Sequence, residues 1–217
     1  MRLLDLFCGA GGAAVGYHRA GFDEIVGVDI TPQPRYPFQF VQADALEFCK
    51  SFGAGFDVIH ASPPCQAYCY LSAFYAQRSA HPKLIEPTRE ILRHTGRIYV
   101  IENVENAPLR SAICLCGSVF GLRVRRHRLF ESSVHLWAMN PRHQHRKQGR
   151  SVGVYGHQGS GSLRPRPRDH GGSFIRAKNA ADANEALGTS GLTWREATQA
   201  IPPAYTEFIG RQLLEAL

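Results

Sequence analysis

The sequence predicts an α/β fold built on a mostly parallel sheet, and three observations point to it. Short apolar runs, typical of buried strands, alternate with helix-compatible stretches through the first 131 residues. Hydrophobic residues make up 44% of the chain and charged residues 20%, a composition that is globular and not disordered. A length of 217 residues corresponds to one domain, alone or with a small appendage, that can bury a core without disulfide or metal staples.

Four strands and two helices are predicted in residues 1–131. The strands are continuous apolar runs at residues 3–7, 25–29, 58–61 and 98–102. The clearest helical patterns between them are at residues 13–20 and 86–94. This alternation of strands and helices is what predicts the parallel sheet.

The remaining chain divides into residues 132–191 and 192–217. The first of these stretches is rich in glycine, proline, arginine and histidine, and only two patches in it are predicted as short strands, at residues 151–155 and 173–175. The second returns to a helical pattern. Thr193 is a predicted N-cap for residues 194–200, Pro202 and Pro203 end that helix, and another helix begins at Tyr205.

Basic residues are concentrated in residues 123–178. This segment contains 13 basic and two acidic residues, a net charge of +11, together with six of the ten histidines, whereas the rest of the chain carries −4. A basic strip on an acidic body is typical of a surface that binds a polyanion. The alternative is a solvated arginine-rich loop.

The sequence lacks the patterns of membrane and exported proteins. No apolar run approaches the roughly 18 residues of a membrane span, and Asp5 lies where a signal peptide would be apolar. We therefore expect a soluble intracellular protein, in the cytoplasm or, for a viral protein, in the host cytoplasm. The six cysteines are then expected to be thiols, and the close pairs, Cys65/Cys69 and Cys114/Cys116, lack zinc-knuckle spacing, so no metal site is predicted.

A glycine-rich turn, residues 8–12 (CGAGG), follows the first predicted strand. Glycines between a strand and a helix let backbone N–H groups approach a ligand. The next strand ends in Asp29, where an acid can accept both hydroxyls of an adenosine ribose, and Asp44 follows another short strand. Together these features indicate a cofactor that contains adenosine; the alternative is a tight turn that uses glycine for steric reasons alone.

Reactive side chains follow two further strands. Two prolines precede Cys65 just beyond the strand that ends at Ala61, and they fix the direction of the thiol. Glu102 ends the next strand, so a thiol and a carboxylate meet at one edge of the sheet as a nucleophile and an acid. A buried structural cysteine is the alternative. Arg126 and Arg128 are predicted on one face of an extended segment, where they can grip a phosphate or a base edge.

In their order along the chain, these motifs resemble those of the DNA (cytosine-5) methyltransferase family. The resemblance rests on Asp5-Leu6-Phe7-Cys8-Gly9-Ala10-Gly11-Gly12, Pro63-Pro64-Cys65-Gln66, Glu102-Asn103-Val104 and Arg126-His127-Arg128, with a weaker match at residues 192–197 and 200–203.

This resemblance implies a Rossmann-like fold of the S-adenosylmethionine-dependent methyltransferases. Residues 1–131 would form the catalytic and cofactor-binding domain. Residues 132–191 would form a small, irregular, basic target-recognition region. Residues 192–217 would pack back on the catalytic domain.

The resemblance also implies a role for each matching residue. Cys65 would add to C6 of cytosine, Glu102 would contact N3 and the exocyclic amine, and Arg126 and Arg128 would orient the base. S-adenosylmethionine, whose product is S-adenosylhomocysteine, would lie against the glycine turn and the neighbouring strand ends, that is, against Phe7, Cys8, Gly9, Ala10, Gly11, Asp29, Ile30, Asp44, Ala45, Pro63, Ala200 and Ile201.

The implied substrate is cytosine in double-stranded DNA, methylated at C5 after the base flips out of the helix. Residues 67–81, which include several aromatic side chains, would close behind the base, or would pack against the core instead. The predicted DNA contacts are Gln66, Tyr68, Arg142, Arg146, Lys147, Arg164 and Arg166. A monomer without an obligate protein partner or a membrane is expected, and restriction–modification is the expected context.

The sequence departs from the family pattern in three places. Val124 stands where the arginine motif usually begins with glutamine, and Thr198 and Gln199 stand where a Gly-Asn turn is usual. The target-recognition region is smaller than usual, which predicts recognition of about two to four base pairs. Three alternatives stay open: C5 methylation of a tRNA, methylation of free deoxycytidine nucleotides, and a DNA-binding derivative of the fold without catalysis.

Overall fold

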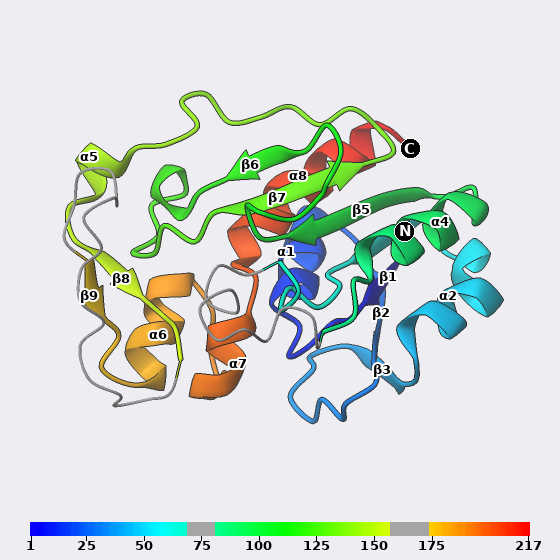
Figure 1. Cartoon of the computed structure of the whole chain (residues 1–217), viewed down its shortest axis with the longest axis horizontal. Coiled ribbons are helices and arrows are strands. Elements are labelled where there is room, and N and C mark those ends of the chain that lie inside the picture. The colour runs from blue at the N-terminus through cyan, green and yellow to red at the C-terminus, as the bar shows by residue number, and fades with distance from the viewer. Residues whose placement is uncertain (69–80, 157–173) are drawn as a thin grey trace.

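The computed structural model describes residues 1–68, 81–156 and 174–217, and a seven-stranded sheet runs through this part of the chain (Figure 1). The strand order is β3-β2-β1-β4-β5-β7-β6. Five strands are parallel, namely β1 (Arg2–Leu6), β2 (Glu24–Asp29), β3 (Gln39–Gln42), β4 (Val58–Ala61) and β5 (Ile98–Asn103). Strand β7 (Arg128–Ser132) runs antiparallel to β5, and β6 (Ile113–Leu115) runs antiparallel to β7. The predicted α/β fold with a mostly parallel sheet is confirmed.

Helices cover both faces of the sheet (Figure 1). Successive strand residues point to opposite faces, so Leu3 packs with α1 (Gly12–Ala20) and α8 (Pro203–Glu215), whereas Leu4 packs with α2 (Ala45–Phe52) and α4 (Ile85–His94). Short 3-10 turns occur at η1 (Gly53–Gly55) and η3 (Gly117–Val119). None of the helices in the described ranges has both the length and the apolar character needed to cross a bilayer.

Helix α8 lies directly against α1, near the glycine turn. A Cβ at Gly16 would lie 2.1 Å from both the carbonyl oxygen of Pro203 and Oγ1 of Thr206. The Thr206 hydroxyl donates to the carbonyl oxygen of Ala13 at 2.8 Å. This close approach, which only glycine at position 16 allows, brings the end of the chain beside the first strand–helix turn.

A second, smaller core lies at the end of the molecule away from β2 and β3 (Figure 1). It combines the parallel pair β8 (Ser151–Gly153) and β9 (Phe174–Arg176) with α6 (Ala180–Leu187) and α7 (Trp194–Gln199), and α5 (His145–Gln148) precedes β8. Its buried residues come from both sides of the boundary predicted between residues 191 and 192. They are Val124, Val152, Val154, Ala177, Ala183, Ala186, Leu187, Leu192, Trp194 and Ala197. Both short strands predicted in this region are therefore present, and α6 is an element that the sequence analysis did not predict.

A buried histidine sits in the middle of the sheet. His60, on β4, is fully buried; its Nδ1 lies 2.9 Å from the hydroxyl of Tyr17 and its Nε2 lies 2.7 Å from that of Ser62. Burial lowers the pKa of His60 to about 3. The ring is therefore neutral in the folded protein at pH values where the unfolded chain protonates it.

We expect this histidine to weaken the fold in acid. The unfolded state binds the extra proton between the unfolded pKa of about 6.5 and the folded pKa, so the free energy of unfolding falls by about 2 kcal/mol between pH 7 and pH 5. The measurement is urea unfolding at several pH values for the wild type, His60→Gln and a surface control, His94→Gln. The difference between wild type and His60→Gln should change with pH; a constant difference contradicts the prediction.

Candidate active site

The sheet topology brings the predicted site residues to one edge. Strands β1 and β4 are neighbours in the middle of the sheet. The chain continues from β1 to β2 on one side of this pair and from β4 to β5 on the other, and ligands of such folds bind beyond the carboxyl ends of the strands at this point. The turn after β1, Asp29 at the end of β2, Cys65 after β4 and Glu102 on β5 all lie at the carboxyl edge of parallel strands. Because β7 is antiparallel, its first residue, Arg128, lies at this edge too.

The glycine turn has an unusual backbone conformation. Phe7, Gly9 and Gly11 have φ values of 57°, 49° and 86°, all in the left-handed region. The N–H of Gly9 donates to Oδ2 of Asp29 at 3.0 Å, which ties the turn to β2. Apart from its two chain neighbours, no heavy atom of the described residues lies within 4 Å of the position that a Cβ would take at Gly9. At Gly9 the turn therefore presents backbone to open space, as a cradle for a ligand requires.

The two predicted acids differ in their surroundings. Asp29 accepts hydrogen bonds from the N–H groups of Gly9 and Thr31, and its neighbour Ile30 is 69% exposed. Asp44 is the N-cap of α2, where Oδ1 accepts from the N–H groups at the first turn of that helix. Capping alone explains an aspartate at position 44, whereas Asp29 is joined directly to the glycine turn.

The C-terminal segment reaches the same turn. A Cβ at Gly12 would lie 2.5 Å from the carbonyl oxygen of Ile201 and 3.4 Å from Cβ of Ala200. Arg35, in the loop after β2, forms an ion pair with Glu196 of α7, with an N–O distance of 2.9 Å. Residues far apart in the sequence, such as Gly12 and Ile201, are thus neighbours beside the glycine turn, as the predicted cofactor contacts require.

The loop that carries Cys65 is fixed to both neighbouring strands. The buried side-chain amide of Asn103 donates to the carbonyl oxygen of Pro63 at 2.7 Å. On the other side, the N–H of Ser62 donates to the carbonyl oxygen of Leu6 at 3.1 Å. Cys65 itself is half-buried, so its thiol is held at the edge of the sheet without being part of the core.

Glu102 and Arg128 form the charged part of the site. Nε of Arg128 lies 3.0 Å from Oε1 of Glu102, whose side chain is 7% exposed. Burial raises the pKa of Glu102 above its usual value, against the opposing effects of Arg128, Arg126 and a hydrogen bond with Ser62. A carboxyl group in this setting can hold a proton close to a bound ring nitrogen.

Arg126 does not lie in an extended segment with Arg128, so that prediction is wrong. Its φ is +39°, and β7 begins only at Arg128. The guanidinium is buried and donates to the carbonyl oxygen of Thr198 at 2.6 Å, while its Nε makes no hydrogen bond within the described residues. Burial, with the charge of Arg128, lowers the pKa of Arg126 to about 10. Arg126 therefore links the site to the C-terminal segment and keeps one donor for a further acceptor.

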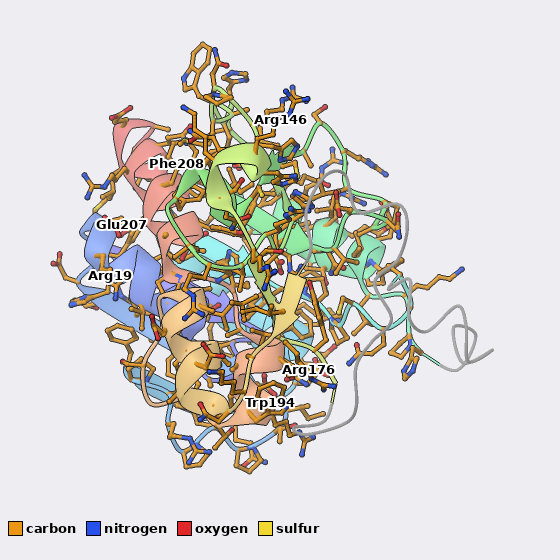
Figure 2. All side chains as sticks on the ribbon, turned by 90° about the vertical axis from the view of Figure 1, so that its left-hand side faces the viewer. Arg19, Arg146, Arg176, Trp194, Glu207 and Phe208 are labelled. Atoms are coloured by element: carbon orange, nitrogen blue, oxygen red, sulfur yellow. The ribbon has the colours of Figure 1, made fainter. Side chains whose placement is uncertain are left out.

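The predicted DNA contacts are only partly described. Gln66, Arg142, Arg146 and Lys147 are exposed, and Arg146 projects from the face that also carries Arg176 and Trp194 (Figure 2). Tyr68 is buried with Ala67, Ile85 and Ala107, so packing against the core, and not a DNA contact, is what the structure supports for this ring. The predicted contacts Arg164 and Arg166, and most of the predicted closing loop at residues 67–81, lie outside the described residues.

Sequence reasoning gave no role to Asn103, Ser62 and Asp5. Asn103 and Ser62 hold the Cys65 loop, as described above, and both stand inside or beside the quoted motifs. Asp5 is fully buried on β1, and the Tyr36 hydroxyl donates to its Oδ2 at 3.1 Å. Burial raises the pKa of Asp5 to about 7. The sequence signal for this unusual carboxyl group was an acid inside an otherwise apolar strand.

Comparison with known proteins agrees with these features. A model of the family described as C-5 cytosine-specific DNA methylase matches residues 1–109. The type II methyltransferase M.XorII of Xanthomonas oryzae is 27% identical over 60% of this chain and 31% of its own. The type II methyltransferase M.FnuDI of Fusobacterium nucleatum is 29% identical over 48% of this chain and 33% of its own. The matched part thus spans about a third of the length of these relatives.

A solved structure shows the same fold over the whole chain. The structure of the S. pombe Dnmt2 methyltransferase superposes with a TM-score of 0.61 at 14% sequence identity, and the match covers 100% of this chain and 98% of the other. At this identity the likeness concerns the fold alone.

Proposed function

This chain belongs to the C-5 cytosine-specific DNA methylase family, and on that premise we propose that it methylates C5 of cytosine in double-stranded DNA with S-adenosylmethionine. The observation that carries the proposal is the convergence of Cys65, Glu102 and Arg128 at one sheet edge, beside an open glycine turn. Restriction–modification is the context we propose, because both relatives are type II methyltransferases.

The residues at the turn fit the cofactor. We propose that the open backbone at Gly9 cradles it and that Asp29, already joined to this turn, accepts from its ribose hydroxyls; Ala200 and Ile201, which lie against Gly12, would close the site from the C-terminal side. S-adenosylmethionine supplies an electrophilic methyl group when bound. We give Asp44 a smaller role in cofactor binding than Asp29, because its Oδ1 caps α2.

Cys65 is the proposed nucleophile. C5 of cytosine is a poor nucleophile until a thiolate adds at C6, which moves the electrons of the C5–C6 double bond toward C5. Glu102 holds a proton at N3, so that the ring accepts this addition without building up negative charge. After methylation, loss of the C5 proton to solvent restores the double bond and expels the thiolate. Because C5 and C6 lie inside the base stack of a duplex, the base must flip out first.

Arg128 and Arg126 are proposed to position the base. Arg128 holds Glu102 through their ion pair, and Nε of the buried Arg126, which makes no hydrogen bond to the part of the chain that the structure describes, is available for an acceptor on the substrate. The exposed Arg142, Arg146 and Lys147 are proposed to contact phosphates, and such contacts weaken as salt concentration rises.

The proposal is tested by trapping the covalent complex. Fluorine at C5 blocks the elimination step, so 5-fluorocytosine in duplex DNA should give an adduct at Cys65 when S-adenosylmethionine is present, detected by peptide mass spectrometry. The same analogue is supplied in a tRNA and as a free nucleotide. An adduct on the tRNA or the nucleotide alone would move the assignment to that substrate. No adduct on any of them, with cofactor binding confirmed by calorimetry, would favour the non-catalytic alternative.

A further inference from the structure

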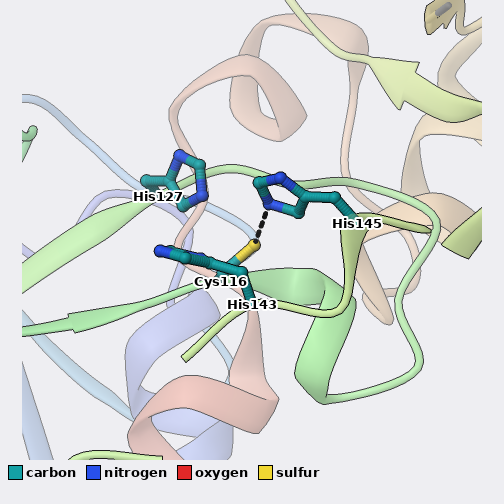
Figure 3. Close-up of side chains that lie close together, drawn as sticks. All are labelled: Cys116, His127, His143 and His145. Carbon is teal, nitrogen blue, oxygen red and sulfur yellow. Dashed lines mark hydrogen bonds between the residues drawn. The ribbon is translucent and has the colours of Figure 1, made fainter. Parts of the chain in front are cut away.

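One cysteine and three histidines lie together outside the proposed active site. Cys116, His127, His143 and His145 each offer one ligand atom, and these four atoms all lie within 4.8 Å of one another (Figure 3). Sγ of Cys116 is 3.2 Å from Nε2 of His145. The three imidazole rings surround the buried thiol, with centroids 4.9 to 5.3 Å apart.

We propose that this cluster is a structural zinc site. In a tetrahedral site with Zn–S of about 2.3 Å and Zn–N of about 2.0–2.1 Å, neighbouring ligand atoms are about 3.3–3.6 Å apart. The pair Cys116 Sγ and His145 Nε2, at 3.2 Å, is already near this spacing, and no two of the four ligand atoms are more than 4.8 Å apart, so rotations of the side chains can complete the geometry. One thiolate and three imidazoles are a donor set that suits zinc, and four protein ligands leave no position for a substrate, which is typical of a structural site.

The surroundings of the ligands match those of a metal site. Nδ1 of His127 lies 3.3 Å from a carboxylate oxygen of Glu105, and its Nε2 is buried with no hydrogen bond to any described residue. A carboxylate on one ring nitrogen is the usual way to orient the other toward a metal. Ser118 fixes the thiol, because its Oγ lies 3.1 Å from Sγ of Cys116 and also accepts from the N–H of Gln144 at 3.0 Å.

The ion would join three separate segments of the chain. Cys116 follows β6, His127 precedes β7, His143 lies just before α5 and His145 is the first residue of that helix. Zinc would therefore fasten the basic segment at residues 142–147 to the edge of the sheet, next to the pair Arg126 and Arg128. This role rests on the geometry of the cluster and does not depend on the methyl transfer proposed above.

The cysteine spacing alone predicted no metal site, and the cluster is at odds with that prediction. Within the cluster, His143 and His145 are the one pair that is close in sequence, while Cys116 and His127 lie at the two ends of the connection between β6 and β7. The fold, and not a local motif, brings the four residues together.

Metal analysis of the intact chain tests the proposal. The wild type is expressed in zinc-supplemented medium, purified and passed over a chelating resin. It should then retain one equivalent of zinc per chain, measured by elemental mass spectrometry. His143→Ala and His145→Ala should lose most of it. The matched controls His135→Ala and Cys114→Ser, which change residues of the same types outside the cluster, should keep it. His143 is exposed, so its replacement leaves the core intact even if Cys116→Ser fails to fold.

Two further measurements separate a built site from an adventitious one. The cobalt-substituted chain should show the visible bands of tetrahedral Co(II) and a thiolate charge-transfer band that is absent without Cys116. Glu105→Gln should weaken zinc affinity by roughly 10–100-fold, as loss of an outer-shell partner does. The proposal is overturned if the wild type holds no more zinc than the buffer does. It is also overturned if the zinc content stays unchanged in both His143→Ala and His145→Ala.

Discussion

Replacement of Cys65 by serine is expected to reduce methyl transfer to DNA by roughly 10⁴-fold or more, the scale on which loss of a covalent nucleophile acts. A serine hydroxyl is far less acidic than a thiol and does not add across the cytosine ring. Cofactor binding should be almost unchanged, because Cys65 lies beyond the glycine turn in the loop tied to Asn103. The measurements are transfer of a labelled methyl group and calorimetric titration with S-adenosylmethionine.

The control for this experiment is Cys69→Ser, which changes the nearest other cysteine in the sequence. It should retain methyl transfer. If Cys65→Ser keeps substantial turnover while Cys69→Ser loses it, the nucleophile has been assigned to the wrong thiol. If cofactor affinity falls together with activity in Cys65→Ser, the loop supports the cofactor site as well, and the assignment of Cys65 to the base alone is wrong.

Local sequence signals were sufficient for the elements that assemble the site. The apolar runs predicted β1, β2, β4 and β5 because strands covered on both faces must be apolar throughout. The end of the chain was equally readable: Thr193 and Glu196 form a capping box at the start of α7. Once the strands are parallel, their carboxyl ends meet at one edge, so the placement of the Cys65 loop and Glu102 at that edge followed from strand order alone.

Features that depend on long-range packing were not predictable. Nothing local shows that β7 runs antiparallel to β5, or that Arg126 takes a left-handed conformation to reach Thr198. Tyr68 is one of several aromatic residues in its stretch, and only the fold shows that it is buried. Helix α6 is different, because Asn179 caps its first turn and Gly188 ends it in the left-handed region. Those signals were present in the sequence and were missed.

A buried ion pair joins strand β7 to helix α4, which packs on one face of the sheet. Arg89 of α4 is 2% exposed, and its Nε and Nη2 donate to the two oxygens of Glu131 at 2.6 and 2.8 Å. The same Arg89 contacts Glu86 and donates to the carbonyl oxygen of Pro108. Both charges are desolvated, and Arg89 supplies the cation that compensates the buried carboxylate of Glu131. Because β7 also carries Arg128, this pair supports the active site indirectly.

Arg89→Met is therefore expected to destabilise the protein by about 3–5 kcal/mol, because it leaves the Glu131 carboxylate buried without its cation. Urea unfolding gives the free energy, with Arg97→Met on the surface as the matched control that should change it little. Adding Glu131→Leu to Arg89→Met should recover much of the loss, since an apolar pair of similar volume removes the uncompensated charge. A loss in Arg89→Met that is no larger than in Arg97→Met, or that Glu131→Leu deepens, would show that the pair does not hold β7 in the way the geometry indicates.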